Sequence, residues 1–391
     1  MATIEERTSG GVSFGLTDEQ RALRDLAHDF AEREIRPKER EYDEHSTHPA
    51  DVIAKAHELG LMNVHIPEAY GGLELGAFEG MLIGEELCWG CSGIGNLVTS
   101  GGFFAEPVLA LGNDEQKRRW IEPLTGEKPV LTSLATTEPG AGSDAASIQT
   151  AATKSGDGYV LRGQKSWISN GGVADFYVVF ATVAPGTRSK GVTAFVVEKG
   201  DEGVSFGAPM KKMGQRAILN AEMFLEDAEV AGDRRLGDEG QGFYGLMHTF
   251  DRSRVTLGAA ATGLARAALE YAVEYSKSRE QFGKPIAEHQ AVAFRLADMA
   301  TRVDASRLLV WRAARRLDAG QPASLEASMA KLFASETAMW CTWAAVQTLG
   351  GWGYSREYPV EKWMRDAKLE EIEEGTSDIQ RLVISRGVLR G

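Results

Sequence analysis

The residues best placed to do chemistry lie near the end of the chain, at positions 373–377, which read Glu-Glu-Gly-Thr-Ser. A carboxylate directly before a glycine can project into a cavity, and a hydroxyl after the glycine can cap the helix that follows. This pattern suits a positioned general base, with Glu374 in that role. The alternative is that Glu373 and Glu374 close a solvated acidic helix begun by Glu370, and that Gly375 is only its C-cap.

Four other motifs occur in order along the chain. Together with the run from Glu374 to Gln380, they resemble the acyl-CoA dehydrogenase family, in which a Glu-Gly-Thr-Ser-x-Ile-Gln run carries the catalytic glutamate. The resemblance covers nearly the whole chain, from about Leu16 to Arg386, and is nearest to the medium- and short-chain enzymes. The four motifs are Glu-Pro-Gly-Ala-Gly-Ser-Asp at 138–144, Gln-Lys-Ser-Trp-Ile-Ser-Asn-Gly at 164–171, Arg-Glu-Gln-Phe-Gly-Lys at 279–284, and Tyr-Pro-Val-Glu-Lys at 358–362 followed by Met-Arg-Asp-Ala at 364–367.

The composition is that of an ordinary soluble globular protein with more than one domain. The chain has 391 residues, 43% of them hydrophobic, which is enough for two or three domains that each bury a core. Its net charge is −13, and it has no large cluster of lysine and arginine. We therefore expect neither a nucleic acid nor an anionic membrane surface as the main partner, although one branch of the family that the chain resembles binds DNA.

Three cysteines are present, Cys88, Cys91 and Cys341, and the first two have the spacing of half a zinc or redox site. Three cysteines cannot make a four-thiolate site, so we interpret them as small buried residues and predict no metal site. Residues 1–12 have neither the apolar core of a signal peptide nor an arginine-rich presequence, and no run is long and apolar enough to cross a membrane. We expect a cytoplasmic protein with a loose N-terminal tail.

Periodicity in the sequence predicts helices, then strands, then helices. A capping box begins the first helix at Thr17, and Pro37 is expected to stop it. The resemblance implies an α+β fold with an N-terminal helical domain, a middle β-sheet (barrel-like) domain and a C-terminal four-helix bundle. Strands are predicted at 159–162, 176–183, 192–197 and 221–225, and long helices at 244–276, 289–318 and 325–349. The predicted boundaries are a flexible tail at 1–15, a helical domain at 16–130, a β domain at 131–240 and a helical bundle at 241–391.

Taking a proton from beside a thioester carbonyl, and a hydride from the next carbon, needs a base, an electron acceptor and donors that hold the carbonyl oxygen. No side chain accepts a hydride, so a cofactor is required, and the resemblance implies FAD with flavin N5 as the acceptor. The match assigns the base to Glu374, whose backbone N–H is expected to hold the thioester oxygen together with a ribityl hydroxyl. Another branch of the family places its base at the position of Ser253, where a serine cannot serve. Enclosure by flavin and acyl chain is expected to raise the pKa of Glu374.

The resemblance also assigns residues to the cofactor, and it implies an FAD site built by two chains of a homo-oligomer, commonly a dimer of dimers. The alternatives are that Trp167 is a strand core residue, Ser169 a turn hydroxyl and Arg279 a solvated cation. Gly140 and Gly142 are not a dinucleotide-binding fingerprint, because a Ser-Asp turn and strands follow them instead of a helix. The cofactor-binding candidates are Thr137, Ser143, Trp167 and Ser169, then Arg279, Gln281, Phe282 and Gln290 from the neighbouring chain, and Gln347, Gly351, Thr376 and Asp378.

Substrate contacts are assigned in the same way. Asp251 and Arg254 are one helical turn apart and are alternatively only an ion pair. Glu373 stands where the family usually has an aromatic residue, so it either hydrogen-bonds a polar acyl group and disfavours an acidic one, or points to water; Trp352 replaces an asparagine of the family's Gly-Gly-Asn-Gly turn. The candidates are Ser143, Asp251 and Arg254 for CoA, and Thr99, Phe103, Glu373 and Gly375 for the acyl group.

The function that the resemblance implies is FAD-dependent α,β-dehydrogenation of an acyl-CoA to the trans-2-enoyl-CoA, with an electron-transfer flavoprotein as acceptor. A first alternative keeps the fold and changes the chemistry: an oxidase, a flavin monooxygenase, or a saturase or reductase acting on a biosynthetic CoA or carrier-protein thioester. A second is a helical scaffold or DNA-binding member that retains FAD without turnover. The acidic net charge and the presence of Glu374 weigh against the second.

Overall fold

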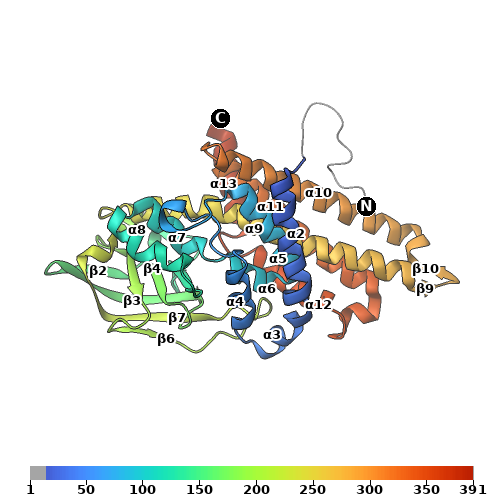
Figure 1. Ribbon diagram of the computed structural model, residues 1–391, viewed down its shortest axis with the longest axis horizontal. Coiled ribbons are helices and arrows are strands. Elements are labelled where there is room, and N and C mark those ends of the chain that lie inside the picture. Colours follow the sequence, from blue (N-terminus) through green and yellow to red (C-terminus); the bar gives the residue numbers. More distant parts are fainter. Residues whose placement is uncertain (1–14, 391) are drawn as a thin grey trace.

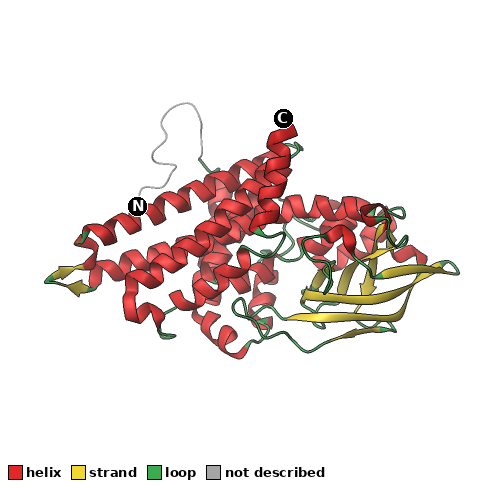
Figure 2. Ribbon diagram, turned by 180° about the vertical axis from the view of Figure 1, so that it is seen from behind, coloured by secondary structure: helices red, strands yellow, loops and turns green. Residues whose placement is uncertain are grey.

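The computed structural model describes residues 15–390, so the loose tail expected at 1–12 lies outside the described residues. One large sheet lies at one end of the molecule, and long C-terminal helices run lengthwise away from it (Figure 1). Figure 2 shows the same separation from behind, with helices packed against one face of the sheet. The α+β fold predicted from the sequence is confirmed.

The first part of the chain is helical. Its helices are α2 (Asp18–Phe30), α3 (Glu39–His45), α4 (Ala50–Glu58), α5 (Ala77–Gly90), α6 (Ser92–Thr99), α7 (Gly102–Leu111) and α8 (Asp114–Ile121). The capping box forms, because Thr17 and Gln20 each accept a hydrogen bond from the other's backbone N–H. The prediction that Pro37 stops the helical course is wrong. The chain continues through a π turn at Ala31–Ile35 and a 3₁₀ turn at Arg36–Lys38, where the proline occupies an early position that needs no donor.

The middle of the chain forms an eight-stranded sheet. Its strands are β1 (Thr132–Ala135), β2 (Ala151–Ser155), β3 (Gly158–Ser169), β4 (Phe176–Thr182), β5 (Val192–Glu198), β6 (Val204–Phe206), β7 (Asn220–Val230) and β8 (Arg235–Leu236). The strand order is β6-β7-β3-β2-β4-β5-β8, and β1 runs parallel to β4. On β4, Val178 and Phe180 belong to the core shared with α7 and α8, whereas Tyr177 and Val179 face the opposite core. Both faces are buried, which is why this strand is apolar throughout.

The last part of the chain is a helical bundle. Its elements are α9 (Gly242–Ser278), β9 (Glu280–Gln281), β10 (Lys284–Pro285), α10 (Gln290–Asp318), α11 (Ser324–Leu349), α12 (Val360–Glu370) and α13 (Ser377–Arg390). Alanines such as Ala261 and Ala268 of α9 and Ala338 and Ala345 of α11 share one buried cluster, and small side chains let helices approach closely. The β9–β10 hairpin lies at the end of the bundle farthest from the sheet (Figure 1).

A buried ionic network joins the N-terminal helices to the bundle where α5 crosses α9. The contact is close, since a Cβ at Gly263 would lie 2.1 Å from the Glu85 carbonyl oxygen. Beside it, Arg266 Nη1 donates to Glu86 Oε1 at 2.8 Å, and Arg307 Nη2 of α10 donates to Glu85 Oε1 at 2.6 Å. The network therefore fixes the position of α5 relative to two helices of the bundle.

One segment, Ser92–Leu111, is long and apolar enough to cross a membrane by length and composition, contrary to the expectation from the sequence. It consists of two helices, α6 and α7, and 56% of its most apolar window is buried inside the protein. Ile94 and Leu97 belong to one core cluster, and Phe104 and Val108 to another. We therefore assign this segment to the protein core.

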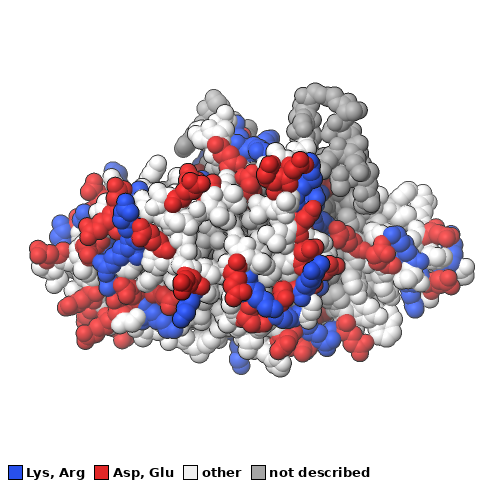
Figure 3. All heavy atoms as spheres, in the orientation of Figure 1, with Lys and Arg blue, Asp and Glu red and all other residues white. Residues whose placement is uncertain are grey.

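Charges of both signs are spread over the surface. On the face drawn in Figure 3, lysine and arginine side chains lie among aspartate and glutamate side chains rather than in a patch of their own. A nucleic-acid backbone is bound through a continuous basic surface, so this face does not suit one.

Candidate active site

One large cavity, of about 1170 Å³, brings together residues that are far apart in the sequence. Small-molecule pockets are typically about 300–1,000 Å³, so this cavity has room for a large cofactor and a substrate together. Its walls come from α6 and α7, from strands β1 and β3, from α9, and from the turn before α13. The predicted site residues that line it are Thr99, Phe103, Thr137, Ser143, Trp167, Ser169, Arg254, Glu373, Glu374, Gly375 and Thr376.

Glu374 lies in a tight turn between α12 and α13. Its φ is 54° and that of Gly375 is 92°, and this left-handed pair explains the glycine after the glutamate. The side-chain amide of the fully buried Gln380 donates to the carbonyl oxygens of Glu374 (3.0 Å) and Gly375 (2.9 Å). Thr376 Oγ1 accepts from the Ile379 N–H at 3.4 Å, so Thr376 caps α13 as predicted. Gln380 therefore fixes the backbone of the turn, and Thr376 fixes the start of the helix that follows it.

Helix α9 positions the Glu374 carboxylate. Ser253 Oγ donates a hydrogen bond to Glu374 Oε2 at 2.8 Å. Burial raises the pKa of Glu374 above its ordinary value. The hydrogen bond from Ser253 and the charges of Arg254 and Lys331 lower this pKa, but the effect of burial is larger. A carboxylate with a raised pKa and one fixed oxygen is suited to take a proton near neutral pH. Ser253 stands where another branch of the family has its base, and here it is the partner of the base candidate.

The main chain of the turn includes a donor that has no partner among the described residues. Within the described part of the chain, the Glu374 N–H donates no hydrogen bond. Lys331 of α11, almost fully buried, donates to the Gly375 carbonyl oxygen at 3.0 Å, and Arg254 Nε lies 3.4 Å from the Glu374 carbonyl oxygen. The sequence reasoning missed Lys331. The only signal for it is a lysine among the buried alanines of α11.

Trp167 lies at an irregularity of β3. The pairing of β3 with β7 shifts register between Lys165 and Ile168, and Trp167 has a φ of 62°. Trp167 is 56% exposed and lines the cavity, so the alternative of a strand core residue is wrong. Ser169 lines the cavity as well, and its Oγ accepts a hydrogen bond from Asn220 Nδ2 at 3.2 Å.

A buried ion pair anchors the loop at 137–143. Lys165 Nζ lies 2.8 Å from Glu138 Oε1 and donates to the Thr136 carbonyl oxygen at 3.1 Å. Burial lowers the pKa of Lys165 to about 8, and the Glu138 charge limits that shift. Glu138 and Ala141 pair through their backbones, and the loop leads to β2 rather than to a long helix. It is therefore no dinucleotide-binding fingerprint, as predicted.

The part of the cavity wall formed by the loop at 137–143 and the residues around the end of β3 fits a large polar cofactor. Thr136 Oγ1 and Asn170 Oδ1 line the cavity and are buried without a hydrogen-bond partner in the part of the chain that the structure describes. Gly142 also lines the cavity, and a Cβ there would meet no atom within 4 Å. Buried polar atoms normally have partners, and a flavin with its ribityl chain would supply them.

Seven of the predicted cofactor residues do not line the cavity, and six of these lie together at one end of the bundle (Figure 1). They lie around the β9–β10 hairpin and the adjoining ends of the long helices, which Arg295 and Thr348 link with a side-chain hydrogen bond of 3.4 Å (Figure 1). Phe282, at the hairpin, is 94% exposed. This chain alone does not bring them to the cavity, and their assignment to FAD stays a prediction. The six are Arg279, Gln281, Phe282, Gln290, Gln347 and Gly351.

Asp251 and Asp378 do not line the cavity, and Thr99 lines it but has no free polar group. Asp251 pairs with Arg254, with Oδ1 and Nη1 3.5 Å apart, and only the arginine lines the cavity. Asp378 is exposed and does not line it. Thr99 lines it, but its hydroxyl donates to the Gly95 carbonyl oxygen at 3.1 Å and so is used within α6.

Behind the cavity wall, Glu370 is fully buried in a polar network. Its Oε1 accepts hydrogen bonds from Ser92 Oγ (2.6 Å), Gln215 Nε2 (2.8 Å) and Asn96 Nδ2 (3.2 Å). Its Oε2 is buried and has no partner in the described chain. Burial raises the pKa of Glu370 to about 7, and the hydrogen bonds limit that rise. The alternative of a solvated acidic helix over 370–374 is therefore wrong.

We expect Glu370→Gln to stabilise the protein most at alkaline pH. The folded pKa, about 7, is above the ordinary 4.5, so the stabilisation from the protonated carboxyl is complete below about pH 4.5 and is lost as pH rises through 7. Glutamine keeps an acceptor for the three donors and does not ionise. The difference in free energy of unfolding between variant and wild type should grow by about 1–3 kcal/mol from about pH 5 to about pH 8, as measured by urea denaturation.

The matched control for this measurement is Glu371→Gln, one residue further on. Glu371 is half-buried and pairs with Lys368 at 2.6 Å. The two variants are compared over the same pH range, so that the effect of the Glu-to-Gln change itself can be subtracted. A stability difference for Glu370→Gln that stays constant over this range would contradict ionisation of Glu370 in the folded protein.

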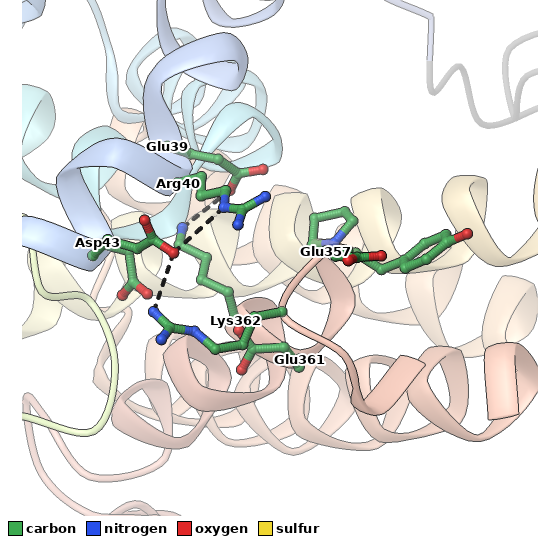
Figure 4. Close-up of a pocket in the computed structure, with 10 residues that line it drawn as sticks. Glu39, Arg40, Asp43, Glu357, Glu361 and Lys362 are labelled. Atoms are coloured by element: carbon green, nitrogen blue, oxygen red, sulfur yellow. Dashed lines mark hydrogen bonds and ion pairs between the residues drawn. The ribbon is translucent and has the colours of Figure 1, made fainter. Parts of the chain in front are cut away.

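A second pocket, of about 100 Å³, opens beside the start of α12 (Figure 4). Its charged side chains neutralise one another: Lys362 Nζ lies 3.0 Å from Glu39 Oε2, and Arg356 Nη2 lies 3.3 Å from Glu44 Oε1. Lys362 also lies 2.8 Å from Asp366. Because these groups are already paired, we interpret the pocket as a packing junction between α3 and α12.

The chain matches known domains over most of its length. It matches the acyl-CoA dehydrogenase N-terminal domain over residues 17–128, the middle domain over 133–228 and the C-terminal domain over 240–389. These matches follow the order of helices, sheet and helices in the structure.

Full-length relatives agree with the domain matches. A cyclohex-1-ene-1-carbonyl-CoA dehydrogenase of Geobacter metallireducens is 47% identical over 96% of this chain and 99% of its own. A 3-(aryl)acrylate reductase of Clostridium sporogenes is 39% identical over 96% of this chain and 99% of its own.

Solved structures agree as well. Butyryl-CoA dehydrogenase from Megasphaera elsdenii has a TM-score of 0.94 at 40% identity, covering 97% of this chain and 100% of that one. A chain in a structure reported for the electron transferring flavoprotein of Acidaminococcus fermentans has a TM-score of 0.95 at 41% identity, with the same coverage. The chain therefore belongs to the acyl-CoA dehydrogenase family of FAD-dependent oxidoreductases.

Proposed function

We propose that this protein catalyses the α,β-dehydrogenation of an acyl-CoA thioester to the trans-2-enoyl-CoA, with Glu374 removing the α-proton. The observation that carries the proposal is the Glu374 turn: Glu374 lines one large cavity, Ser253 fixes its carboxylate, and its backbone N–H has no partner in the described chain. Bound FAD supplies the acceptor for the β-hydride.

Each part of the turn has its own task in this proposal. The carboxylate takes the proton and carries it after the reaction. The Glu374 N–H donates to the thioester oxygen and so stabilises the negative charge that develops on it. Gln380 and Lys331 hold the carbonyl oxygens of Glu374 and Gly375, which fixes the direction of that N–H.

The reductive direction is a second candidate. It is favoured by the identity of 39% to the 3-(aryl)acrylate reductase. In that direction Glu374 gives its proton to the α-carbon, so the same residue serves both reactions and the redox partner decides between them. For the dehydrogenase direction we propose an electron-transfer flavoprotein as acceptor, because of the structural likeness to the Acidaminococcus chain.

We also propose that a second copy of the chain completes the FAD site, which makes the protein a homo-oligomer. The support is the position of the six predicted cofactor residues at the far end of the bundle, away from their own cavity. In this proposal these residues contribute to the cavity of a neighbouring chain.

Anaerobic addition of acyl-CoAs to the FAD-loaded protein tests the proposed function. The panel holds short, medium and long straight chains together with branched and alicyclic acyl groups. Rapid bleaching of the oxidised flavin band with one subset supports dehydrogenation and identifies the substrate class. Bleaching by no acyl-CoA, in protein shown to hold FAD, would overturn the proposal.

Ser253→Ala is expected to shift the pH dependence of the reaction. The variant loses the hydrogen bond that lowers the pKa of Glu374, so the acid limb of kcat/KM against pH should move to higher pH. The rate near neutral pH should fall about tenfold and recover in part at alkaline pH. Ser335→Ala, which removes a buried hydroxyl bonded to the Leu332 carbonyl oxygen at 3.2 Å, is the matched control. An unshifted profile would show that Ser253 does not set the ionisation of Glu374.

A further inference from the structure

Glu373, the residue before the proposed base, has a carboxyl group in the cavity wall and no partner for it. It lines the same cavity as Glu374, and its Oε1 is buried without a hydrogen bond in the described chain. The expectation that it points to water is wrong for this oxygen. Rotation about the last side-chain bond exchanges the two oxygens at little cost, so either can face the cavity. A buried polar group of this kind normally has a partner.

The two cations nearest to Glu373 are already engaged. Lys331 Nζ donates to the Gly375 carbonyl oxygen at 3.0 Å. Lys212 Nζ donates to the Ile218 carbonyl oxygen at 2.7 Å. Within the described residues, neither lysine lies within ion-pair distance of a carboxylate. The protein itself therefore supplies no cation that pairs with Glu373.

The polar groups on the other side are also engaged. Ser92, Asn96 and Gln215 all donate to Glu370 Oε1, one turn before Glu373. The Glu373 N–H donates to the Leu369 carbonyl oxygen at 3.0 Å, which continues the helical turn; Glu373 lines the cavity, whereas Glu370 lies behind its wall. The partner that Glu373 lacks has to come from the cavity.

The Glu373 carboxyl is surrounded by charge of both signs. Burial raises its pKa well above the ordinary range, Glu370 and Glu374 add to this, and Lys331 and Lys212 oppose it. The group therefore keeps its proton at a pH where an exposed glutamate has lost it. A protonated carboxyl donates through one oxygen and accepts through the other.

We propose that Glu373 is a specificity-determining residue that selects acyl groups bearing a hydroxyl beyond the two reacting carbons. The inference rests on the proposed dehydrogenase function. A hydroxyl satisfies the carboxyl oxygen that faces the cavity in either orientation, because it accepts from that oxygen when the oxygen carries the proton and donates to it when it does not. A plain alkyl chain leaves the group buried and unpaired, and a terminal carboxylate would add another acid beside Glu370 and Glu374.

The test uses pairs of acyl-CoAs in which a hydroxyl replaces a methyl group of the same size. Suitable pairs are 4-hydroxybutyryl-CoA with pentanoyl-CoA, 5-hydroxypentanoyl-CoA with hexanoyl-CoA, and 6-hydroxyhexanoyl-CoA with heptanoyl-CoA. In at least one pair the wild type should prefer the hydroxyl member by about tenfold or more in kcat/KM. Preference for the methyl member in every pair would overturn the inference.

Two variants tie this preference to Glu373. Glu373→Met removes the hydrogen-bonding group and should reduce the ratio by about tenfold to a hundredfold, whereas Glu373→Gln keeps a donor and an acceptor and should leave it within about threefold. Glu371→Gln, whose residue does not line the cavity, is the control. Because the ratio compares two substrates on one preparation, a partly folded variant does not distort it. A ratio that Glu373→Met leaves unchanged would also overturn the inference.

Binding separates this inference from the proposed function. Isothermal titration calorimetry of the same pairs, on Glu374→Gln protein with and without Glu373→Met, measures the ratio of Kd values without turnover. If no acyl-CoA bleaches the flavin but the Kd ratio depends on Glu373, the proposed function fails and the inference stands. If the flavin is bleached and neither ratio depends on Glu373, the inference fails and the function stands.

Discussion

Glu374→Gln is expected to abolish flavin reduction while leaving cofactor and substrate bound. Glutamine has the same shape and can still accept the hydrogen bond from Ser253, but it cannot take a proton. The rate of flavin reduction by the best acyl-CoA should fall about 10⁴-fold, which is the upper end of what a positioned general base contributes. We expect this upper end because, within the described residues, Ser253 holds no carboxylate other than that of Glu374. Stopped-flow absorbance of the flavin band measures it. FAD content and the Kd of the thioester should stay within about threefold of wild type.

Two further variants make this result specific. Glu371→Gln makes the same change three residues earlier, outside the cavity lining, and should reduce the flavin at the wild-type rate. Ser253→Ala added to Glu374→Gln should cause no further loss, because Ser253 acts through the carboxylate that is already gone. If Glu374→Gln reduced the flavin within about tenfold of wild type, another group would have to be the base.

Local patterns predicted most of the fold. The capping box at Thr17 and the long periods of α9, α10 and α11 depend on neighbours within a few residues, and these predictions are confirmed. Helix α6 was not separated from its surroundings in the sequence, because all of its residues from Ser92 to Val98 are buried and it has no polar face to give a period. The prediction that Pro37 ends the helix was wrong for a different reason. A proline stops a helix only where its missing donor matters, and here it opens a new turn.

The roles of residues within the site could be predicted only for residues that belong to a recognisable motif. The motif gave Glu374, but not Ser253, which lies 121 residues earlier in the chain and reaches the base only because α9 passes beside the turn. The contact of Lys331 with Gly375 and the buried pair of Lys165 with Glu138 also join residues far apart in the sequence, 44 and 27 residues respectively. The environment of Glu373 was likewise set by tertiary packing, since helical spacing alone allowed it to face water. The burial of Cys88, Cys91 and Cys341, by contrast, follows from residue type and is confirmed.

Arg266→Met is expected to have the largest effect on stability. Arg266 lies between Glu85 and Glu86 of α5, which expose only 6% and 4% of their side chains. Burial alone would raise the pKa of Glu86, but the charge and hydrogen bonds of Arg266, with a hydrogen bond from His28, lower it to about 2. Removing the arginine leaves buried negative charge uncompensated, which costs about 3–5 kcal/mol. The thermal midpoint should fall by about 4–6 °C in differential scanning calorimetry.

The control for Arg266→Met lies on the same helix. Lys277 pairs with Glu274 at 2.5 Å, but the two side chains are 61% and 72% exposed, so Lys277→Met should change stability by no more than about 0.5 kcal/mol. Adding Glu86→Gln to Arg266→Met should recover part of the loss, because it removes one of the stranded charges. A fall of less than about 2 °C for Arg266→Met alone would show that the network is not a net support of the fold.

This ionic network also has a consequence for the site. Helix α5 leads directly into α6, which carries Thr99, while α9 carries Ser253 and Arg254, and all three residues line the cavity. Arg266 and Arg307 hold α5 against α9 and α10, so they set the relative position of helices whose residues line the cavity. At a temperature where Arg266→Met is still folded, the KM for the acyl-CoA should therefore rise more than kcat falls, because the walls move while the Glu374 turn keeps its own contacts with Ser253 and Gln380.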